Sequence, residues 1–228
     1  MSQSLIVVTQ QETGMYNQTW FYGGSGNSLQ EDKIKEYWNE DFYINSVAYT
    51  SKGWFVTMAK GLKWTNQSYS YKSSWPDEWI QEKRKSGYMI TSLSTSGSNW
   101  MVVMSKNTDY KTQEICSAPW STMKDWIKKW WNNDYYITSL TCRNGMWTVV
   151  MSKTSLYIDQ SYMSSSTTSG IKEKIKNDRH TEMTYSRTMN IILLYANRGP
   201  ALFKFMNRKY SYTKGKKYIE KIEEINKK

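Results

Sequence analysis

The sequence predicts a mainly β fold with short helices, in which tandem β-β-β-α units of about 46 residues close into a propeller-like ring of four or five small blades. Three observations support this fold. A tryptophan that opens an apolar run recurs at Trp54, Trp100 and Trp147, 46 and 47 residues apart. A β-branched and aromatic run with a Gly- or Asn-containing turn precedes each tryptophan. Incomplete units stand at both ends of the array, and closure would protect their edges. An open stack of the same units is the alternative.

The first two strands of each unit form a predicted hairpin. The first strand is carried by Tyr88-Met-Ile-Thr-Ser-Leu and Tyr136-Ile-Thr-Ser-Leu, with Tyr43-Ile-Asn-Ser-Val as a looser copy. Turns follow at residues 51–53, 96–98 and 143–145. Alternation gives the second strand two faces: Trp100, Val102, Met104 and Lys106 on one, and Met101, Val103 and Ser105 on the other. Because both faces are largely apolar, we expect both to be covered.

A third strand and a short helix complete each unit. The strand is expected around a recurring glutamine, at Gln67, Gln113 and Gln160, with Gln18 as a fourth copy. Helices are expected from residues 75 and 120, with Pro76 in the first helical turn and Ser121 as an N-cap. Their apolar stripes are Ile34 and Trp38 in one copy, and Met123, Trp126, Ile127 and Trp130 in another. The helix is therefore expected to dock on the sheet.

The repeat domain is predicted to span residues 1–197, with units near 1–42, 43–87, 88–134 and 135–178 and a degenerate unit at 179–197. Residues 4–10 resemble a second strand without a first, and residues 182–195 resemble a first and second strand. Ring closure would pair residues 5–8 with residues 183–185. Residues 198–228 form a basic C-terminal extension, whose terminal helix at 217–225 would carry Tyr218, Ile222 and Ile225 on one side.

Composition and charge bound the class of protein. The net charge is +11, and the extension at residues 198–228 holds ten Lys or Arg against three Glu. Cys116 and Cys142 occupy different units without a CxxC spacing, so we expect free thiols, no disulfide framework and no zinc site. The N-terminus lacks the basic and apolar regions of a signal peptide, and no apolar run could span a bilayer. We expect a soluble, cytoplasmic protein without membrane contact.

The repeat motif resembles that of a known but uncharacterised family. The motif consists of Trp-Ile, then Gly or Asp followed by Tyr-x-Ile-Thr-Ser, then Trp-x-Val-Val-Met-Ser-Lys and a later Gln. It is similar to a repeat found C-terminal to plant casein-kinase-like kinases and beside bacterial caspase-like domains. The resemblance covers roughly residues 30–165 and is looser at 34–67, where Asn45 and Val47 replace Thr and Leu. It implies an accessory, non-catalytic module, and it carries over no functional residues.

No motif predicts catalysis, a metal or a cofactor. His180 is the only histidine and lies in a polar segment, residues 177–182, that is expected to be a solvated loop. The glycine-rich segment at residues 22–27 lacks the following Lys-Ser/Thr of a phosphate-binding loop, so a flexible inter-strand loop is expected there. An enzyme of unfamiliar type is the least favoured class.

Two repeated sets are candidate binding residues. Lys60, Lys106 and Lys153 would form an anion-attracting collar at one rim of a ring, or would each extend along the Trp and Met of their own strand to solvent. Gln67, Gln113 and Gln160 would bind a ligand, or would make buried hydrogen bonds to the backbone of a neighbouring strand.

The leading functional prediction is a non-catalytic scaffold domain that binds other proteins within a larger assembly. The alternative is a nucleic-acid-associated structural protein of a ribosome-like or virion particle. The extension would then lie along nucleic acid or an acidic protein surface, through basic residues interleaved with aromatic ones. These basic residues are Lys204, Arg208, Lys209, Lys214, Lys216 and Lys217.

Overall fold

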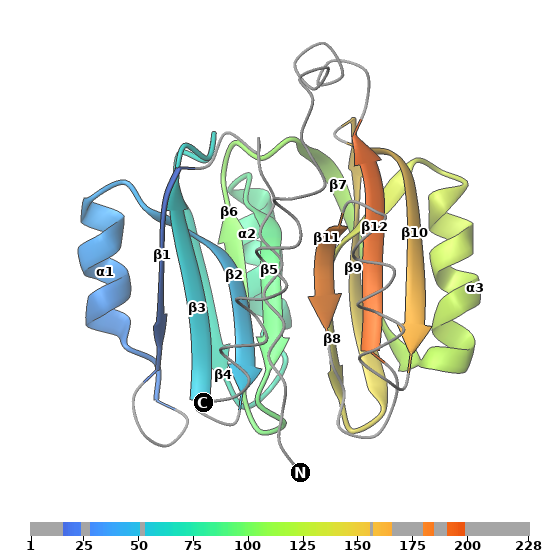
Figure 1. Cartoon of the computed structure of the whole chain (residues 1–228), viewed down its shortest axis with the longest axis horizontal. Coiled ribbons are helices and arrows are strands. Elements are labelled where there is room, and N and C mark those ends of the chain that lie inside the picture. Colours follow the sequence, from blue (N-terminus) through green and yellow to red (C-terminus); the bar gives the residue numbers. More distant parts are fainter. Residues whose placement is uncertain are drawn as a thin grey trace, which may run out of the picture. The chain divides into compact units, whose positions relative to one another are not determined.

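The computed structural model describes residues 16–23, 28–50, 53–155, 157–165, 180–184 and 191–198 (Figure 1). The chain divides into two compact units. One contains residues 12–154 and 186–189, and the other contains residues 1–11, 155–185 and 190–228. The predicted strand at residues 4–10, the terminal helix and the basic extension beyond Arg198 lie outside the described residues.

The first unit contains three repeats of a strand, a helix and a hairpin. The first repeat consists of β1 (Tyr16–Tyr22), α1 (Glu31–Asn39), β2 (Tyr43–Thr50) and β3 (Gly53–Lys60). The second consists of β4 (Gln67–Lys72), α2 (Asp77–Lys85), β5 (Met89–Thr95) and β6 (Trp100–Ser105). The third consists of β7 (Tyr110–Pro119), α3 (Trp120–Trp131), β8 (Tyr135–Arg143) and β9 (Met146–Thr154). The other unit holds β10 (Tyr157–Ser165), β11 (His180–Thr184) and β12 (Ile191–Arg198).

Each repeat forms one three-stranded antiparallel sheet. The strand orders are β1-β3-β2, β4-β6-β5, β7-β9-β8 and β10-β12-β11, so the second hairpin strand is always central. The mainly β fold with short helices is confirmed, and the chain order of hairpin, glutamine-bearing strand and helix is as predicted. The grouping of these strands into sheets differs from the predicted units. The glutamine-bearing strand pairs with the hairpin that follows it, as β4 does with β6. In the first three sheets, the two outer strands are therefore parallel, and a helix provides the crossover that parallel strands need.

A left-handed residue follows each helix and turns the chain into the next strand. These residues are Asp41 (φ 63°), Gly87 (φ 82°) and Asp134 (φ 63°). After α1, the Asp41 amide donates to the carbonyl of Trp38, and the Phe42 amide donates to the carbonyl of Tyr37. This Schellman pattern satisfies helix carbonyls and places an aromatic residue at the start of the following strand.

The starts of the helices differ from the sequence prediction. Helix α3 begins at Trp120 with Pro119 in the N-cap position, so Ser121 lies inside the helix and not at its cap. Pro76 is itself the N-cap residue of α2, one position before the predicted first turn. Neither helix has a side-chain cap hydrogen bond. The preceding prolines are compatible with these starts because they fix φ and lack an amide that needs a partner.

Each of the first three sheets has two distinct faces. The helix face bears the residues equivalent to Trp54, Val56 and Met58 and packs against the helix of the same repeat, whose Ile34 is fully buried in α1. In the second and third repeats, the opposite face, here called the back face, packs against the preceding repeat, as Met101 and Val103 of β6 do in the first core cluster. Every residue of β6 is buried, which confirms that this strand is covered on both sides.

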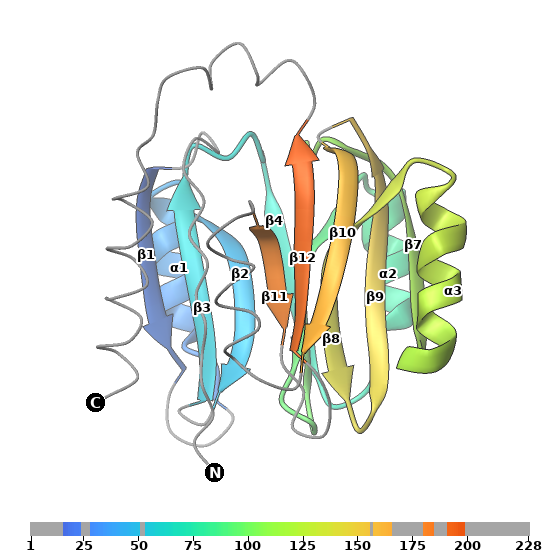
Figure 2. The same ribbon diagram turned by 45° about the vertical axis from the view of Figure 1, so that its right-hand side comes forward.

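The first hairpin strands of successive repeats, β2, β5 and β8, are neighbours. Strand β5 contacts both β2 and β8, and Figure 1 shows β2 and β5 side by side. Each has a bulge near its start, for example between Ile44 and Ser46 in β2. The hairpin turn at Asn144 (φ 51°) and Gly145 (φ 80°) has the two positive φ values of a type I′ turn. Helix α3 lies along β7, as Figure 2 also shows.

The fourth sheet has the same strand order as the others. Strand β12 pairs with both β10 and β11, so the degenerate unit predicted at residues 179–197 supplies the hairpin of this sheet. His180 begins strand β11, and the solvated loop predicted for residues 177–182 is therefore wrong at this position. Cys116 and Cys142 are free thiols, as predicted.

Candidate functional site

Gln67 binds the edge strand of the preceding repeat. Its Oε1 accepts a hydrogen bond from the Ile44 amide at 2.7 Å, and its Nε2 donates to the Ile44 carbonyl at 2.9 Å. The same Nε2 donates to Ser105 Oγ at 3.0 Å, and Trp38 Nε1 donates to Oε1 at 3.0 Å. Ile44 is fully buried in the edge strand β2, so water cannot pair with its backbone groups. The side-chain amide of Gln67 supplies the hydrogen bonds that this strand needs on its open side. We call this arrangement the glutamine clamp.

Gln113 forms the same clamp one repeat later. Its Oε1 accepts from the Ile90 amide at 2.7 Å, and its Nε2 donates to the Ile90 carbonyl at 2.8 Å and to Ser152 Oγ at 2.9 Å. Gln160 is also buried, with 7% of its surface exposed. Of the two roles considered for these glutamines, the buried backbone bond is the one present at Gln67 and Gln113.

A repeated serine adds a second bond to each edge strand. Ser92 Oγ accepts from the Val47 amide at 3.1 Å, and Ser139 Oγ accepts from the Leu93 amide at 3.0 Å. Both serines are buried in the first strand of the following repeat. The sequence analysis did not predict this role, although the serine recurs in the Thr-Ser-Leu motif. Together with the glutamines, they occupy the backbone amides of an otherwise open sheet edge.

The three repeated lysines each lie over an aromatic ring. In every case the ring belongs to the residue that follows the left-handed turn after the helix of the same repeat. The distances from Nζ to the ring centroid are 4.7 Å for Lys60 over Phe42, 4.9 Å for Lys106 over Tyr88 and 5.7 Å for Lys153 over Tyr135. The lysines remain partly exposed, so each ammonium group has a cation–π partner and access to water. An anion-binding collar stays a prediction.

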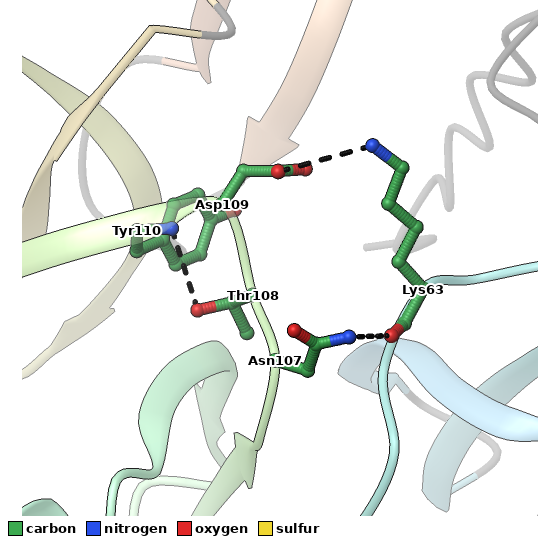
Figure 3. A network of polar contacts seen from close by, with 5 residues as sticks. All are labelled: Lys63, Asn107, Thr108, Asp109 and Tyr110. Atoms are coloured by element: carbon green, nitrogen blue, oxygen red, sulfur yellow. Dashed lines mark hydrogen bonds and ion pairs between the residues drawn. The ribbon is translucent and has the colours of Figure 1, made fainter.

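The loops beside these lysines join neighbouring repeats. Asn107 Nδ2 donates to the Lys63 carbonyl at 2.7 Å, and Lys63 Nζ lies 4.0 Å from the carboxylate of Asp109 (Figure 3). The Lys106 amide also donates to the Asn66 carbonyl at 2.8 Å. The ion pair is exposed and adds little stability, so the backbone bonds carry this contact.

The first sheet has an exposed back face. Trp20 is 61% exposed, and Gln18 and Ser46 are exposed as well. The Trp20 ring lies 5.7 Å from Phe55 and 5.9 Å from Tyr22, measured between centroids. The face thus combines an aromatic cluster with two polar side chains at the positions that form hydrogen bonds in later repeats.

Two titratable groups between repeats have shifted pKa values. Burial, followed by the charge of Glu31 and a hydrogen bond to it, raises the pKa of Tyr69 to about 12. Burial lowers the pKa of Arg84, against the opposing effects of Glu114 and Asp77. The Arg84 guanidinium donates to the Gln113 carbonyl at 3.4 Å. Both groups lie in packed contacts, so these shifts reflect packing between repeats.

The described residues bear on the metal and membrane predictions but do not include the basic extension. Among the described residues, no group of three or more His, Cys, Asp or Glu side chains is placed to hold a metal ion. Within the same residues, no helix is long and apolar enough to cross a membrane. The basic residues from Lys204 to Lys217 lie outside the described residues.

Comparisons with known proteins identify a family. A family model with the description "Domain of unknown function (DUF7477)" matches twice, at residues 1–118 and 114–199. The casein kinase 1-like protein HD16 of Oryza sativa subsp. japonica is 36% identical to this chain over 75 residues. That match covers 32% of this chain and 11% of the rice protein. No solved structure is significantly similar to the chain.

Proposed function

We propose that this chain, which belongs to the DUF7477 family, is a non-catalytic scaffold domain that binds other proteins within a larger assembly. The observation that carries this proposal is the repetition of the contacts. The glutamine and serine of the second and third repeats hold backbone groups of the preceding repeat. Recurring polar residues of this kind build a framework, whereas catalysis needs one asymmetric group of unlike side chains.

The match to the rice protein agrees with an accessory role. The similarity covers only 11% of that protein, so a segment like this one is a small part of a much longer chain. A module that recurs as a small part of a larger protein suits binding or bridging.

The arrangement that we favour for the array is a propeller-like ring of four sheets. Its support is the common strand order of all four sheets and the contact between back face and preceding repeat that recurs in the second and third repeats. In such a ring, Lys60, Lys106 and Lys153 would stand at one rim, because each lies at or within one residue of the end of the central strand of its sheet.

Affinity capture tests the scaffold role. The tagged full-length chain is used to capture partners from an extract of its source organism, with and without nuclease, and the complexes are sized by gel filtration. The scaffold role predicts a protein complex that keeps its size after nuclease treatment. A complex that collapses on digestion would instead establish the nucleic-acid-associated alternative, which the basic extension favours.

A further inference from the structure

The back face of the first sheet carries the residues that join later repeats, but here these residues are exposed. Gln18 stands where Gln67 stands in the second sheet, and Ser46 stands where Ser92 stands. Gln67 and Ser92 both bind the preceding edge strand. Gln18 and Ser46 are exposed, and neither side chain has a hydrogen-bond partner among the described residues. The first sheet therefore presents the chemistry of a repeat contact without a repeat against it among residues 16–154.

An exposed aromatic side chain lies on the same face. Trp20 pairs with Thr57 in the first sheet just as Tyr69 pairs with Val103 in the second. Tyr69 packs against Trp38 of the preceding repeat, with ring centroids 5.7 Å apart. Trp20, at the equivalent position, is 61% exposed. A large aromatic that is exposed here but covered in the next repeat indicates a surface for interaction with another protein.

The side chains of this face are uncharged. They belong to Gln18, Trp20, Tyr22, Ser46, Phe55 and Thr57. A nucleic-acid site would need Lys or Arg side chains to pair with phosphates, so the face does not suit a polyanion. Amide and hydroxyl groups pair instead with the amides and carbonyls of a protein backbone, and exposed aromatic residues are enriched where proteins meet. The chemistry of the face thus fits a protein partner.

The contacts of the second repeat show which part of a protein fits. Gln67 pairs with both backbone groups of Ile44, and Ser92 pairs with the amide of Val47. Outward amides alternate along a regular strand, so a spacing of three residues needs a bulge like the one between Ile44 and Ser46. The side chains of Ile44 and Val47 lie in the core of their own repeat. A matching partner therefore presents a bulged edge strand of a folded sheet.

A second copy of the first unit does not offer such a strand. In β2 and β5, the amides at these positions already donate to side chains of the following repeat. In β8, Ile137 and Leu140 stand at the same positions and also have partners. A second copy of residues 16–154 therefore cannot fill the face, which favours a different protein.

We propose that the back face of the first sheet binds a partner protein of the assembly through a bulged edge strand of that partner. In this contact, the Gln18 side chain pairs with the amide and the carbonyl of one partner residue, and Ser46 Oγ accepts a hydrogen bond from the amide three residues later. Trp20 packs against the same partner, as Tyr69 packs against the preceding repeat. In the ring proposed above, the partner's strand takes the position before the first repeat. The inference names the partner chemistry of the scaffold role and rests on that role.

Capture of partners by the tagged full-length chain, from a nuclease-treated extract of its source organism, tests the face with three variants. Trp20→Glu and Gln18→Leu should each lower the recovery of the partner by about tenfold or more, the loss expected at the centre of an interface. Met146→Glu is the matched control, since Met146 is 42% exposed at a hairpin turn of the third repeat, and it should recover as much as the wild type. Thermal unfolding checks each variant, and Gln18→Leu decides the question if Trp20→Glu lowers the stability.

Hydroxyl-radical footprinting of the wild type locates the contact. In the free monomer, Trp20 should be oxidised readily, whereas Trp147, which is 1% exposed, should be protected. If Trp20 is as protected as Trp147 in the monomer, the face is already covered within the chain and the inference is overturned. In the captured complex, oxidation of Trp20 should fall while that of Met146 stays the same. Equal oxidation of Trp20 in the monomer and in the complex would also overturn it.

Hydrogen exchange of the captured partner identifies the segment that binds. The amides that slow on binding should belong to an edge strand of a sheet, and slowing confined to a helix or a loop would overturn the strand chemistry. A captured protein that proves to be a second copy of this chain would overturn the choice of a different protein. Recovery that both variants leave unchanged would overturn the face and leave the scaffold role intact. The lack of any nuclease-resistant complex with the wild type would refute the scaffold role itself, and the inference with it.

Discussion

Replacing Gln67 by methionine should destabilise the protein strongly, although it changes side-chain volume little. The substitution removes hydrogen bonds to the amide and the carbonyl of Ile44, to Ser105 and to Trp38. Ile44 is fully buried, so its two backbone groups are left without partners and without water. At about 1–3 kcal/mol for each unpaired buried group, the expected loss is about 2–6 kcal/mol. This is a large part of the stability of a typical domain.

Urea unfolding followed by tryptophan fluorescence measures this loss. With an m-value of about 2 kcal/mol/M, the midpoint should fall by about 1–3 M. Gln81→Met is the matched control, because Gln81 is exposed on α2 and should change stability by less than about 0.5 kcal/mol. If Gln67→Met unfolds within about 0.5 kcal/mol of the wild type, the clamp does not stabilise the contact between repeats, and the reasoning is refuted.

Three further predictions concern the core, the pH dependence and the extension. Trp147→Ala should cost about 3–5 kcal/mol in the same assay, because Trp147 is 1% exposed and its loss leaves a cavity beside Trp120; a change below 1 kcal/mol would contradict its core position. The folded-state pKa of Tyr69 is raised from 10 to about 12, so its stabilising effect is complete below pH 10 and is lost as the pH rises through about 12. Tyr69→Phe should therefore lose less stability than the wild type between pH 10 and 12, and equal losses would contradict the shift. Truncation after Asn197 should weaken polyanion binding and flatten its salt dependence in fluorescence anisotropy, since residues 198–228 hold ten Lys or Arg against three Glu; an unchanged slope would place the affinity elsewhere.

The repeat and the secondary structure could be predicted from the sequence because local patterns determine them. Alternation in Trp100–Ser105 predicted a strand buried on both faces, and the structure confirms it. The recurring glutamine predicted both a strand and a backbone bond at Gln67 and Gln113. These features depend on side-chain period and on the hydrogen-bonding groups of one residue type.

The pairing of the glutamine-bearing strand could not be predicted in the same way. Two hairpin strands pair because a short turn joins them. Strand β4 has no such turn, and its backbone could pair equally well with the hairpin before it or with the hairpin after it, which is the one it joins. The choice depends on the following helix, which carries the chain across to the parallel outer strand. The roles of Ser92 and Ser139 were missed for the same reason, because they depend on which sheet lies against the first strand.

The difference between Gln18 and Gln67 also needed three-dimensional information. Gln18 and Gln67 are copies of the same repeated position in the sequence, and only the structure shows that Gln67 is buried and Gln18 is exposed. The same holds for Trp20, whose exposure contrasts with the packed position of Tyr69. Burial of a repeated position depends on its neighbours in the array and not on its own residue type.

The central claim is that side chains of the second and third repeats hold the edge strand of the repeat before them. Residue-resolved hydrogen exchange of the wild-type amides of Ile44, Val47, Ile90 and Leu93 tests it most directly, because all four donate to side chains of the following repeat. The account predicts that these amides exchange as slowly as amides paired within the sheets. Exchange as fast as that of exposed loop amides would contradict it.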